Sequence, residues 1–197
     1  MSTPEPRSVN GGAPGVRLAN CTTDVVEIAA LRGRAVDLER IATDRGTRLP
    51  ARGRVVLSAD QAALCVRPER WLLLAQPAAP GACAAAWQEA CASVGAAVDL
   101  SSGLAVLHLA GPAVRELLAR GCRLDLDSGE FAPGRAAATI VAQVPVILAA
   151  TPAGMLLLTP ATTARHFCEW LDSSAAPHGL ERLPAARLSR LCGEPPS

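Results

Sequence analysis

The stretch AVDLSSGLAVLHLAGPAVRELLARGCRLDL, residues 97–126, decides the fold because it contains a complete strand–helix unit. Its apolar run at 104–109 predicts a buried strand. A helix is predicted next, since Pro112 suits a first helical position and Gly121 lies just past the last turn. Glu116 and Arg120 have the i,i+4 spacing of an ion pair on the outer face. The inner face is expected to hold Val114, Leu117 and Leu118.

The same order of elements occurs in both halves of the chain. The first half predicts a strand at 24–31, a helix at 34–46, strands near 61–66 and 70–75, and a helix at 80–95. In the second half, the strand and helix of the opening stretch are followed by an irregular passage at 121–135, strands near 136–150 and 155–158, and a helix at 159–171. Each half thus runs strand, Gly-ended helix, irregular loop, two strands and Trp-bearing helix.

This repeat predicts an α+β fold of two similar lobes, in which helices pack on antiparallel sheets. The lobes are expected at 16–95 and 96–172. Residues 1–15, rich in Pro, Gly, Ser and Asn, are typical of a disordered leader. The tail at 173–197 is either an amphipathic segment that docks on a partner or a disordered end. Its leucines are Leu180, Leu183, Leu188 and Leu191.

Local signals place the helix ends and the buried helix faces. Gly46 and Gly95 are expected to close the first two long helices, and Pro80 to lie near the first turn of the second. Thr159 is expected to cap the last helix, with Pro160 in its first position. The buried faces are expected to be Ala35, Leu38, Ile41 and Ala42; Cys83, Trp87, Cys91 and Val94; and Ala164, Phe167, Cys168 and Leu171.

Residues 136–164 contain no charged side chain, and an apolar run of this length could span a bilayer. Pro145, Pro152 and Pro160 interrupt the run, and Pro152-Ala153-Gly154 is typical of a turn. Two buried strands joined by a hairpin therefore explain the run better than a membrane span does.

Composition excludes several classes of protein. Nineteen basic and eighteen acidic residues nearly cancel, which leaves no electrostatic surface for nucleic acid. The chain has no Tyr, two Phe and three Trp, too few for a platform that stacks single-stranded bases. Its seven Cys form no C-x-x-C pair, and its N-terminus lacks the apolar core of a signal peptide. We therefore expect a cytoplasmic protein with reduced thiols.

Several side chains near the opening stretch could in principle serve chemistry. Ser101 and Ser102 could be nucleophiles, but no G-x-S-x-G motif provides a base, so strand-edge hydrogen bonding is the better interpretation. His108 lies on an apolar strand, which favours a hydrogen-bonded core or interface imidazole over a general base. Cys122 has only Arg120 and Arg123 nearby in sequence to activate its thiol.

No metal or nucleotide site is predicted. Asp125, Asp127 and Glu130 lack the ligand alternation of an EF-hand loop, which favours a solvated loop. His166 and His178 are expected at the surface, and no two His have the spacing of metal ligands. The sequence contains no P-loop and no G-x-G-x-x-G motif.

The segment at 98–131, VDLSSGLAVLHLAGPAVRELLARGCRLDLDSGEF, resembles the gamma subunit family of heterotetrameric sarcosine oxidases. RPERWLLLAQP at 67–77 and ARHFCEWL at 164–171 are similar to further segments of that family. Ser102 and Leu104 depart from it, since members often have Asp and Arg there. The residues that carry the resemblance are Val98, Asp99, Ser101, Gly111, Pro112, Ala113, Leu117, Leu118, Gly121, Leu124, Asp125, Leu126, Phe131, Trp170 and Leu171.

The resemblance implies a two-lobed relative of the aminomethyltransferase, or folate-binding, fold. It implies a non-catalytic subunit of a complex that oxidises sarcosine to glycine, passes the methyl carbon to tetrahydrofolate or releases it as formaldehyde, and produces hydrogen peroxide. FAD, FMN and NAD would belong to the larger subunits and zinc to a small one, so the implied partners are the alpha, beta and delta subunits. No catalytic, cofactor-binding or metal-binding residue is implied in this chain, and the isolated chain is expected to be inactive.

Alternative hypotheses remain open. The chain could be the equivalent subunit of a dehydrogenase for another N-methyl amino acid. It could be a free-standing folate-binding protein of the same fold, although RGCRLDL at 120–126 keeps only the Gly-Cys of the Lys-Gly-Cys-Tyr-x-Gly-Gln signature. A hydrolase that uses Ser101 or Ser102 is a third class, and it predicts labelling by a fluorophosphonate.

Overall fold

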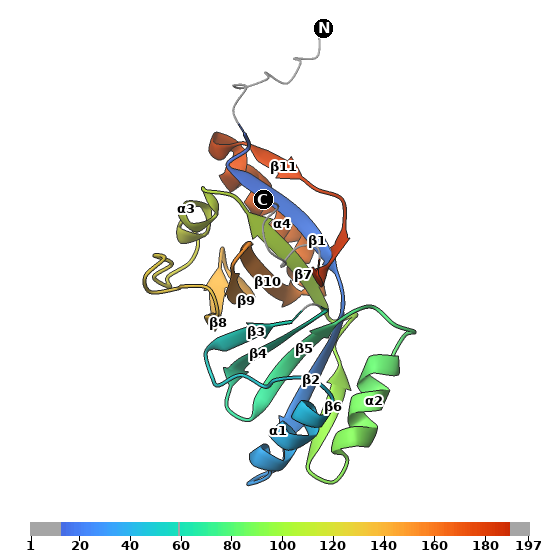
Figure 1. The fold of residues 1–197 in the computed structure, drawn as a ribbon. Helices are drawn as coiled ribbons and strands as arrows, with labels where there is room; N and C mark the ends of the chain where they lie inside the picture. Colours follow the sequence, from blue (N-terminus) through green and yellow to red (C-terminus); the bar gives the residue numbers. More distant parts are fainter. Residues whose placement is uncertain (1–12, 59, 190–197) are drawn as a thin grey trace, which may run out of the picture.

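The computed structural model describes residues 13–58 and 60–189, which form two sheets and four α-helices (Figure 1). The larger sheet consists of β1 (Val16–Thr22), β7 (Leu104–Ala110), β8 (Ala136–Val141), β9 (Val144–Thr151), β10 (Gly154–Pro160), β11 (Leu180–Arg182) and β12 (Ala186–Arg187). The smaller sheet consists of β2 (Asp24–Ala30), β3 (Arg54–Leu57), β4 (Gln61–Arg67), β5 (Arg70–Ala75) and β6 (Gly95–Asp99). The helices are α1 (Ala35–Asp44), α2 (Ala82–Cys91), α3 (Val114–Ala119) and α4 (Ala161–Ala175), followed by the short 3₁₀ helix η1 (Ala176–His178).

The strand order is β11-β1-β7-β10-β9-β8 in the larger sheet, with β12 also beside β1, and β3-β4-β5-β2-β6 in the smaller. β11 and β12 run parallel to β1, and the other neighbouring strands are antiparallel. This arrangement confirms the predicted α+β class with antiparallel sheets and packed helices.

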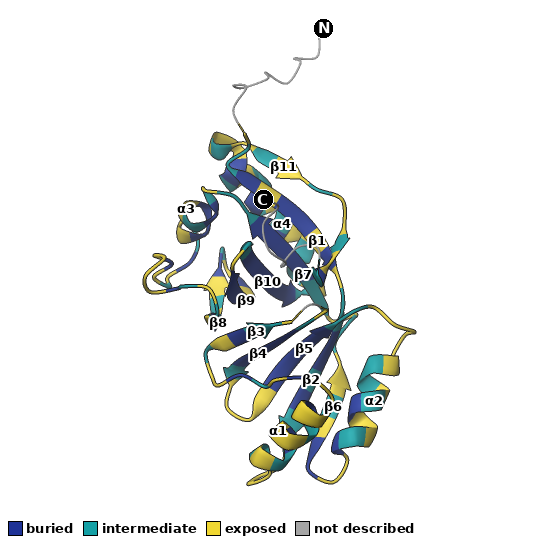
Figure 2. Cartoon of the chain, viewed as in Figure 1, coloured by how far each residue is buried: buried dark blue, intermediate teal, exposed yellow. Residues whose placement is uncertain are grey.

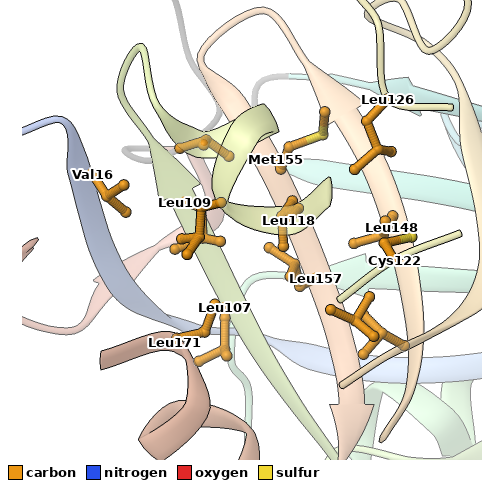
Figure 3. Close-up of a cluster of buried hydrophobic side chains, with 14 of the residues drawn as sticks. Val16, Leu107, Leu109, Leu118, Cys122, Leu126, Leu148, Met155, Leu157 and Leu171 are labelled. Carbon is orange, nitrogen blue, oxygen red and sulfur yellow. The ribbon is translucent and has the colours of Figure 1, made fainter. Parts of the chain in front are cut away.

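Three apolar cores hold the elements together. One lies between the larger sheet and α3 and α4, and its members include Leu109, Leu118 and Leu157 (Figure 3). A second joins the facing sides of the two sheets, and a third lies between the smaller sheet and α1 and α2. Because both faces of the central strands are covered, these strands are dark over most of their length in Figure 2.

Burial on both faces explains the uninterrupted apolar runs of the sequence. In β10, Met155 and Leu157 face the helices, while Leu156 and Leu158 face the smaller sheet. A strand in such a position has no solvent side and therefore shows no polar alternation. The long uncharged run at 136–164 consists of strands and the start of α4, and among the described residues no helix is long and apolar enough to cross a membrane.

The two sheets do not follow the expected lobes at 16–95 and 96–172. β1 belongs to the larger sheet, where Leu18 pairs with Leu109, and β6 belongs to the smaller sheet, where Ala97 pairs with Ile28. The chain therefore passes from one sheet to the other between β1 and β2 and returns between β6 and β7. Sequence periodicity does not identify the hydrogen-bonding partner of a strand, which is why the expected boundaries placed the residues of both strands in the other unit.

The predicted strand at 136–150 is two strands, because the chain reverses at Ala142 and Gln143. Both residues have positive φ, 49° and 66°. A two-residue hairpin of this kind normally contains Asn-Gly, so Ala-Gln gives no turn signal in the sequence. β1, β3, β6, β11 and β12 are further strands that the pattern did not predict.

Several predicted helix ends need correction. Gly46 does follow α1 in a left-handed conformation, φ 73°, but Gly95 begins β6 instead of closing α2. Pro112 lies in the turn before α3, whose N-cap is Ala113. Thr159 does not cap α4, because its hydroxyl is buried and donates to the carbonyl of Pro145 at 3.2 Å. Pro160 is the N-cap of α4.

The first part of the tail packs on its own chain. β11 and β12 lie along β1, and the Leu188 side chain is 2% exposed in the core between the sheets. The carbonyl of His178 accepts a hydrogen bond from the N–H of Gly15 at 2.9 Å. Residues 1–12 of the expected leader and residues 190–197 of the tail lie outside the described residues.

Candidate functional site

Ser101 is the candidate nucleophile of the opening stretch, and its hydroxyl is engaged with backbone groups. The Ser101 Oγ accepts a hydrogen bond from the N–H of Val25 at 3.0 Å, and its own N–H donates to Asp99 Oδ1 at 2.9 Å. These bonds fix the turn between β6 and β7 against β2. The hydrogen bonds from Ser101 also hold the pKa of the Asp99 carboxyl below its ordinary value. Ser102 lies in the same turn and is exposed.

His108 is in the middle of β7 and is 4% exposed. Its partners across the sheet are Ala19 on β1 and Leu156 on β10, so neither neighbouring strand places an acid opposite the ring. Burial, with a smaller contribution from the positive charge of Arg17, lowers the pKa of the imidazole to about 4. His108 is thus a neutral imidazole, and its place in the core is the one expected for it. Its Nε2, however, finds no hydrogen-bond partner among the described residues.

The passage at 121–135 is held in place by α3, through a residue that the sequence analysis did not identify. The Arg115 guanidinium donates to the carbonyl of Leu126 and to that of Phe131, the latter at 3.1 Å. Cys122 is buried beside β8, with its Sγ 3.7 Å from the Thr139 hydroxyl. Both contacts anchor the passage to its surroundings.

The three acidic residues of this passage do not converge. Asp125 and Asp127 accept hydrogen bonds from backbone N–H groups two residues further along, at 2.9 and 2.8 Å, as in Asx turns. Glu130 is exposed. Within residues 13–58 and 60–189, no three His, Cys, Asp or Glu side chains come together in a way that could hold a metal ion.

The other two His residues differ in their exposure. His166 is exposed on α4, as predicted. His178, expected at the surface, is only partly exposed, with 15% of its side chain accessible. Its Nε2 lies 3.0 Å from Arg120 Nη2, and Arg120 also pairs with Glu116 at 3.4 Å, which confirms the predicted i,i+4 pair. This network joins α3 to η1.

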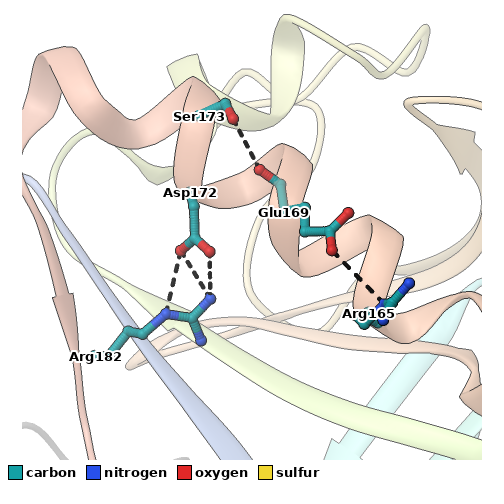
Figure 4. Close-up of polar contacts among 5 residues, drawn as sticks. All are labelled: Arg165, Glu169, Asp172, Ser173 and Arg182. Carbon is teal, nitrogen blue, oxygen red and sulfur yellow. Dashed lines mark hydrogen bonds and ion pairs between the residues drawn. The ribbon is translucent and has the colours of Figure 1, made fainter.

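A second polar contact fastens the tail to α4 (Figure 4). The Arg182 guanidinium on β11 contacts the Asp172 carboxylate through Nε and Nη2, with Nη2 2.6 Å from Oδ2. The neighbouring pair of Arg165 and Glu169 is looser, at 3.6 Å, and lies within the helix. The sequence offers no signal for the Arg182 contact, because it depends on the pairing of β11 with β1.

A cleft of about 510 Å³ lies between α1, α2 and the end of β5. The Arg45 guanidinium is 5.0 Å from the centroid of the Trp87 ring at its side. Burial, followed by the charges of Asp24 and Asp99, raises the pKa of the Cys83 thiol in the same cleft. A thiol with a raised pKa stays neutral and is a poor nucleophile.

The fold defines the class of protein. The chain is similar to glycine cleavage system aminomethyltransferase T from Bartonella henselae, with a TM-score of 0.61, 16% identity, and coverage of 86% of this chain and 48% of that one. It is also similar to a chain of the heterotetrameric sarcosine oxidase from Corynebacterium sp. U-96, with a TM-score of 0.75, 28% identity, and coverage of 88% and 90%. The two-sheet architecture is therefore that of the aminomethyltransferase class of folds, as the resemblance implied.

The family follows from the sequence comparisons. The profile of the sarcosine oxidase, gamma subunit family matches residues 32–177. Sarcosine oxidase subunit gamma from Corynebacterium sp. (strain U-96) is 37% identical over 78 residues, and that from Arthrobacter sp. is 34% identical over 110 residues. These matches cover 39% and 55% of this chain, and the chain spans 38% and 54% of the length of these two relatives. The chain belongs to the sarcosine oxidase gamma subunit family.

Proposed function

We propose that this chain is the gamma subunit of a heterotetrameric sarcosine oxidase and that it supports the assembly of the complex without taking part in its chemistry. The observation that carries the proposal is the likeness to a chain of a heterotetrameric sarcosine oxidase, which extends over most of both chains. The family match over 32–177 supports the same role.

The proposed complex oxidises sarcosine to glycine. The methyl group leaves at the oxidation level of formaldehyde, and its two electrons reduce dioxygen to hydrogen peroxide. The carbon passes to tetrahydrofolate as co-substrate, or water hydrolyses the oxidised N-methyl group and formaldehyde is released. In this proposal the alpha, beta and delta subunits are the partners, FAD, FMN and NAD are bound by the larger subunits and zinc by the small one, and the complex is cytoplasmic.

The contacts of the reactive side chains support a non-catalytic role for this chain. The Ser101 hydroxyl is part of a turn, the Cys122 thiol is packed against β8, and the His108 ring is neutral and surrounded by apolar strands. A nucleophile needs a base within hydrogen-bond reach. Ser101 and Cys122 bond to other groups, and neither has the His108 ring as a hydrogen-bond partner.

Co-expression with the neighbouring genes tests the proposal. We expect genes for two flavoprotein subunits and one small zinc-binding subunit beside this one, and native mass spectrometry of the purified protein should give a complex with one copy of each chain. The isolated chain should oxidise no sarcosine and should bind no flavin. A stable flavin-free monomer that joins no partner when all four chains are co-expressed would contradict the proposal.

Substrate assays on the same complex distinguish the closest alternatives. Hydrogen peroxide release from sarcosine should exceed that from N-methylglutamate, whereas the reverse result indicates a dehydrogenase for another N-methyl amino acid. Tight binding of tetrahydrofolate by the isolated chain would instead support a free-standing folate-binding protein.

A further inference from the structure

Two arginines face each other at a place where the two sheets meet. Arg54 begins β3 of the smaller sheet, and Arg135 immediately precedes β8 of the larger sheet (Figure 1). The two residues are partners in an isolated antiparallel bridge, and both are exposed. This bridge therefore carries two positive charges side by side at the surface.

The backbone hydrogen bonds on either side of the bridge bring the two side chains close together. The N–H of Val55 donates to the carbonyl of Gly134 at 3.0 Å, and the N–H of Ala136 donates to that of Gly53 at 2.9 Å. The two arginines between these bonds form a non-hydrogen-bonded pair, the closer of the two antiparallel geometries, with Cα atoms about 4.5 Å apart. Like charges that lie directly opposite each other in this way destabilise the pairing.

Another pair of opposed arginines has an acid beside it. Arg67 on β4 faces Arg70 on β5, and Nη1 of Arg70 lies 2.8 Å from Oε1 of Glu27. In the part of the chain that the structure describes, no carboxylate forms an ion pair with Arg54 or Arg135. The described chain thus compensates one opposed pair and leaves the other without a counter-charge.

A pocket of about 400 Å³ opens beside the bridge, and a third arginine, Arg52, lines it together with Arg135. Its other lining residues include the ring of Phe131 and the carboxylate residues Asp125 and Glu130. Neither carboxylate forms an ion pair with an arginine of the pocket among the described residues. The pocket therefore offers guanidinium donors, an apolar surface and separate carboxylate acceptors.

This mixture of groups favours a peptide over other anionic ligands. A carboxylate side chain can accept two parallel hydrogen bonds from one guanidinium. Asp125 and Glu130 would repel a free polyanion, but their oxygens can accept hydrogen bonds from the backbone N–H groups of a peptide. The net charge of the chain is only +1, which provides no field for nucleic acid.

We propose that the arginine cluster of Arg52, Arg54 and Arg135 binds an acidic segment of a partner subunit, whose carboxylates supply the missing counter-charge. This proposal rests on the proposed function, which provides the partner. The wall of the pocket is fixed before binding, because the Arg115 guanidinium ties the passage at 121–135 to α3. A site that is already ordered loses little conformational entropy when its partner binds.

Two substitutions test the cluster while preserving the backbone. Arg54→Gln and Arg135→Gln each remove one charge and keep a polar side chain. Because each also removes the repulsion across the bridge, the isolated variant chains should unfold at the same temperature as the wild type or slightly higher. Arg67→Gln is the matched control, since Arg67 is also exposed and opposite another arginine but lies outside the cluster.

Association is measured by diluting the purified complex and following this chain by native mass spectrometry. We expect each single variant of the cluster to weaken association by about 10-fold and the double variant by about 100-fold, while Arg67→Gln changes it by less than about 3-fold. Association of the wild type should also weaken as the salt concentration rises, and that of the double variant should depend less on salt.

Equal association of the double variant and the wild type would overturn this proposal and leave the proposed function standing. A thermal midpoint lowered by more than about 4 °C in the isolated double variant would also overturn it, because the arginines would then serve the fold. Failure of the wild-type chain to join any partner would overturn both.

Discussion

The ring of Trp170 lies in the space that Gly121 leaves by having no side chain. A Cβ at position 121 would be 2.7 Å from Cζ2 of Trp170 and 3.0 Å from the backbone nitrogen of Ala142. Trp170 also stacks on Phe167, with the ring centroids 5.9 Å apart. The end of α3, the aromatic side of α4 and the hairpin after β8 therefore meet at one glycine.

Gly121→Ala is expected to lower the free energy of unfolding by about 1–3 kcal/mol, because the ring and the hairpin backbone both have to move. Urea unfolding measures this change, and tryptophan fluorescence should report a displaced Trp170. Gly103→Ala is the control, since a Cβ there meets only the Leu100 carbonyl at 3.6 Å and should change stability little. An equal decrease in the free energy of unfolding for the two variants would show that the close approach of Trp170 does not determine the effect at position 121.

His108 makes stability depend on pH. Its pKa is lowered from 6.5 to about 4 in the folded chain, so between these values the unfolded chain binds a proton that the folded chain does not. Stability is therefore fully present above pH 6.5 and falls as the pH decreases towards 4. The loss attributable to this residue is at most about 3 kcal/mol.

The measurement is urea unfolding across that pH range, for the wild type and for His108→Leu. The variant should have a shallower decrease in stability between pH 6.5 and 4, because leucine takes up no proton. Parallel curves for the two proteins would contradict the assignment of this dependence to His108.

The contact between Arg182 and Asp172 is expected to affect local opening of the tail more than the stability of the whole fold. Both side chains are about half exposed, so Arg182→Ala should lower the free energy of unfolding by only about 0.2–1 kcal/mol. Hydrogen exchange at 180–189 should nevertheless accelerate, because β11 loses its fixed point on α4. Arg165→Ala, which removes the looser pair with Glu169, should leave this exchange as it is in the wild type.

The hairpin between β8 and β9 can be made more stable. Ala142 and Gln143 both have positive φ, which costs free energy for residues with a Cβ. Ala142→Asn combined with Gln143→Gly provides the residues that such a turn favours and should raise the free energy of unfolding by about 1 kcal/mol. Thermal unfolding measures the effect, and an unchanged or lower midpoint would show that the turn is not strained.

The sequence predicts those parts of the fold whose signals lie within one element, such as the spacing of apolar residues along a helix. The buried faces of the helices follow from spacing alone, and Trp87, Phe167 and Leu171 are buried as expected. β1 lacks a clear pattern because Arg17 and Asn20 interrupt its apolar residues, and β6 is short with one buried residue. Their sheet partners lie far away in sequence, and no local pattern records them.

The candidate site shows the same division. That Ser101 has a structural role could be predicted from the missing base, but its partner Val25 could not, since 76 residues separate them. The sequence places Arg115 in a helix, but nothing in it indicates that the guanidinium donates to the carbonyls of Leu126 and Phe131. Contacts from a side chain to a distant backbone leave no periodicity in the sequence.

The position of β1 has a consequence for the order in which the chain folds during synthesis. The smaller sheet uses only residues of the continuous stretch 24–99, so it can close as soon as that stretch has left the ribosome. β1 is synthesised before that stretch, but its partners β7 on one side and β11 and β12 on the other are synthesised only after it. Among the described strands, β1 is thus synthesised first and is among the last to be completed, and until then its open edges need protection from other chains.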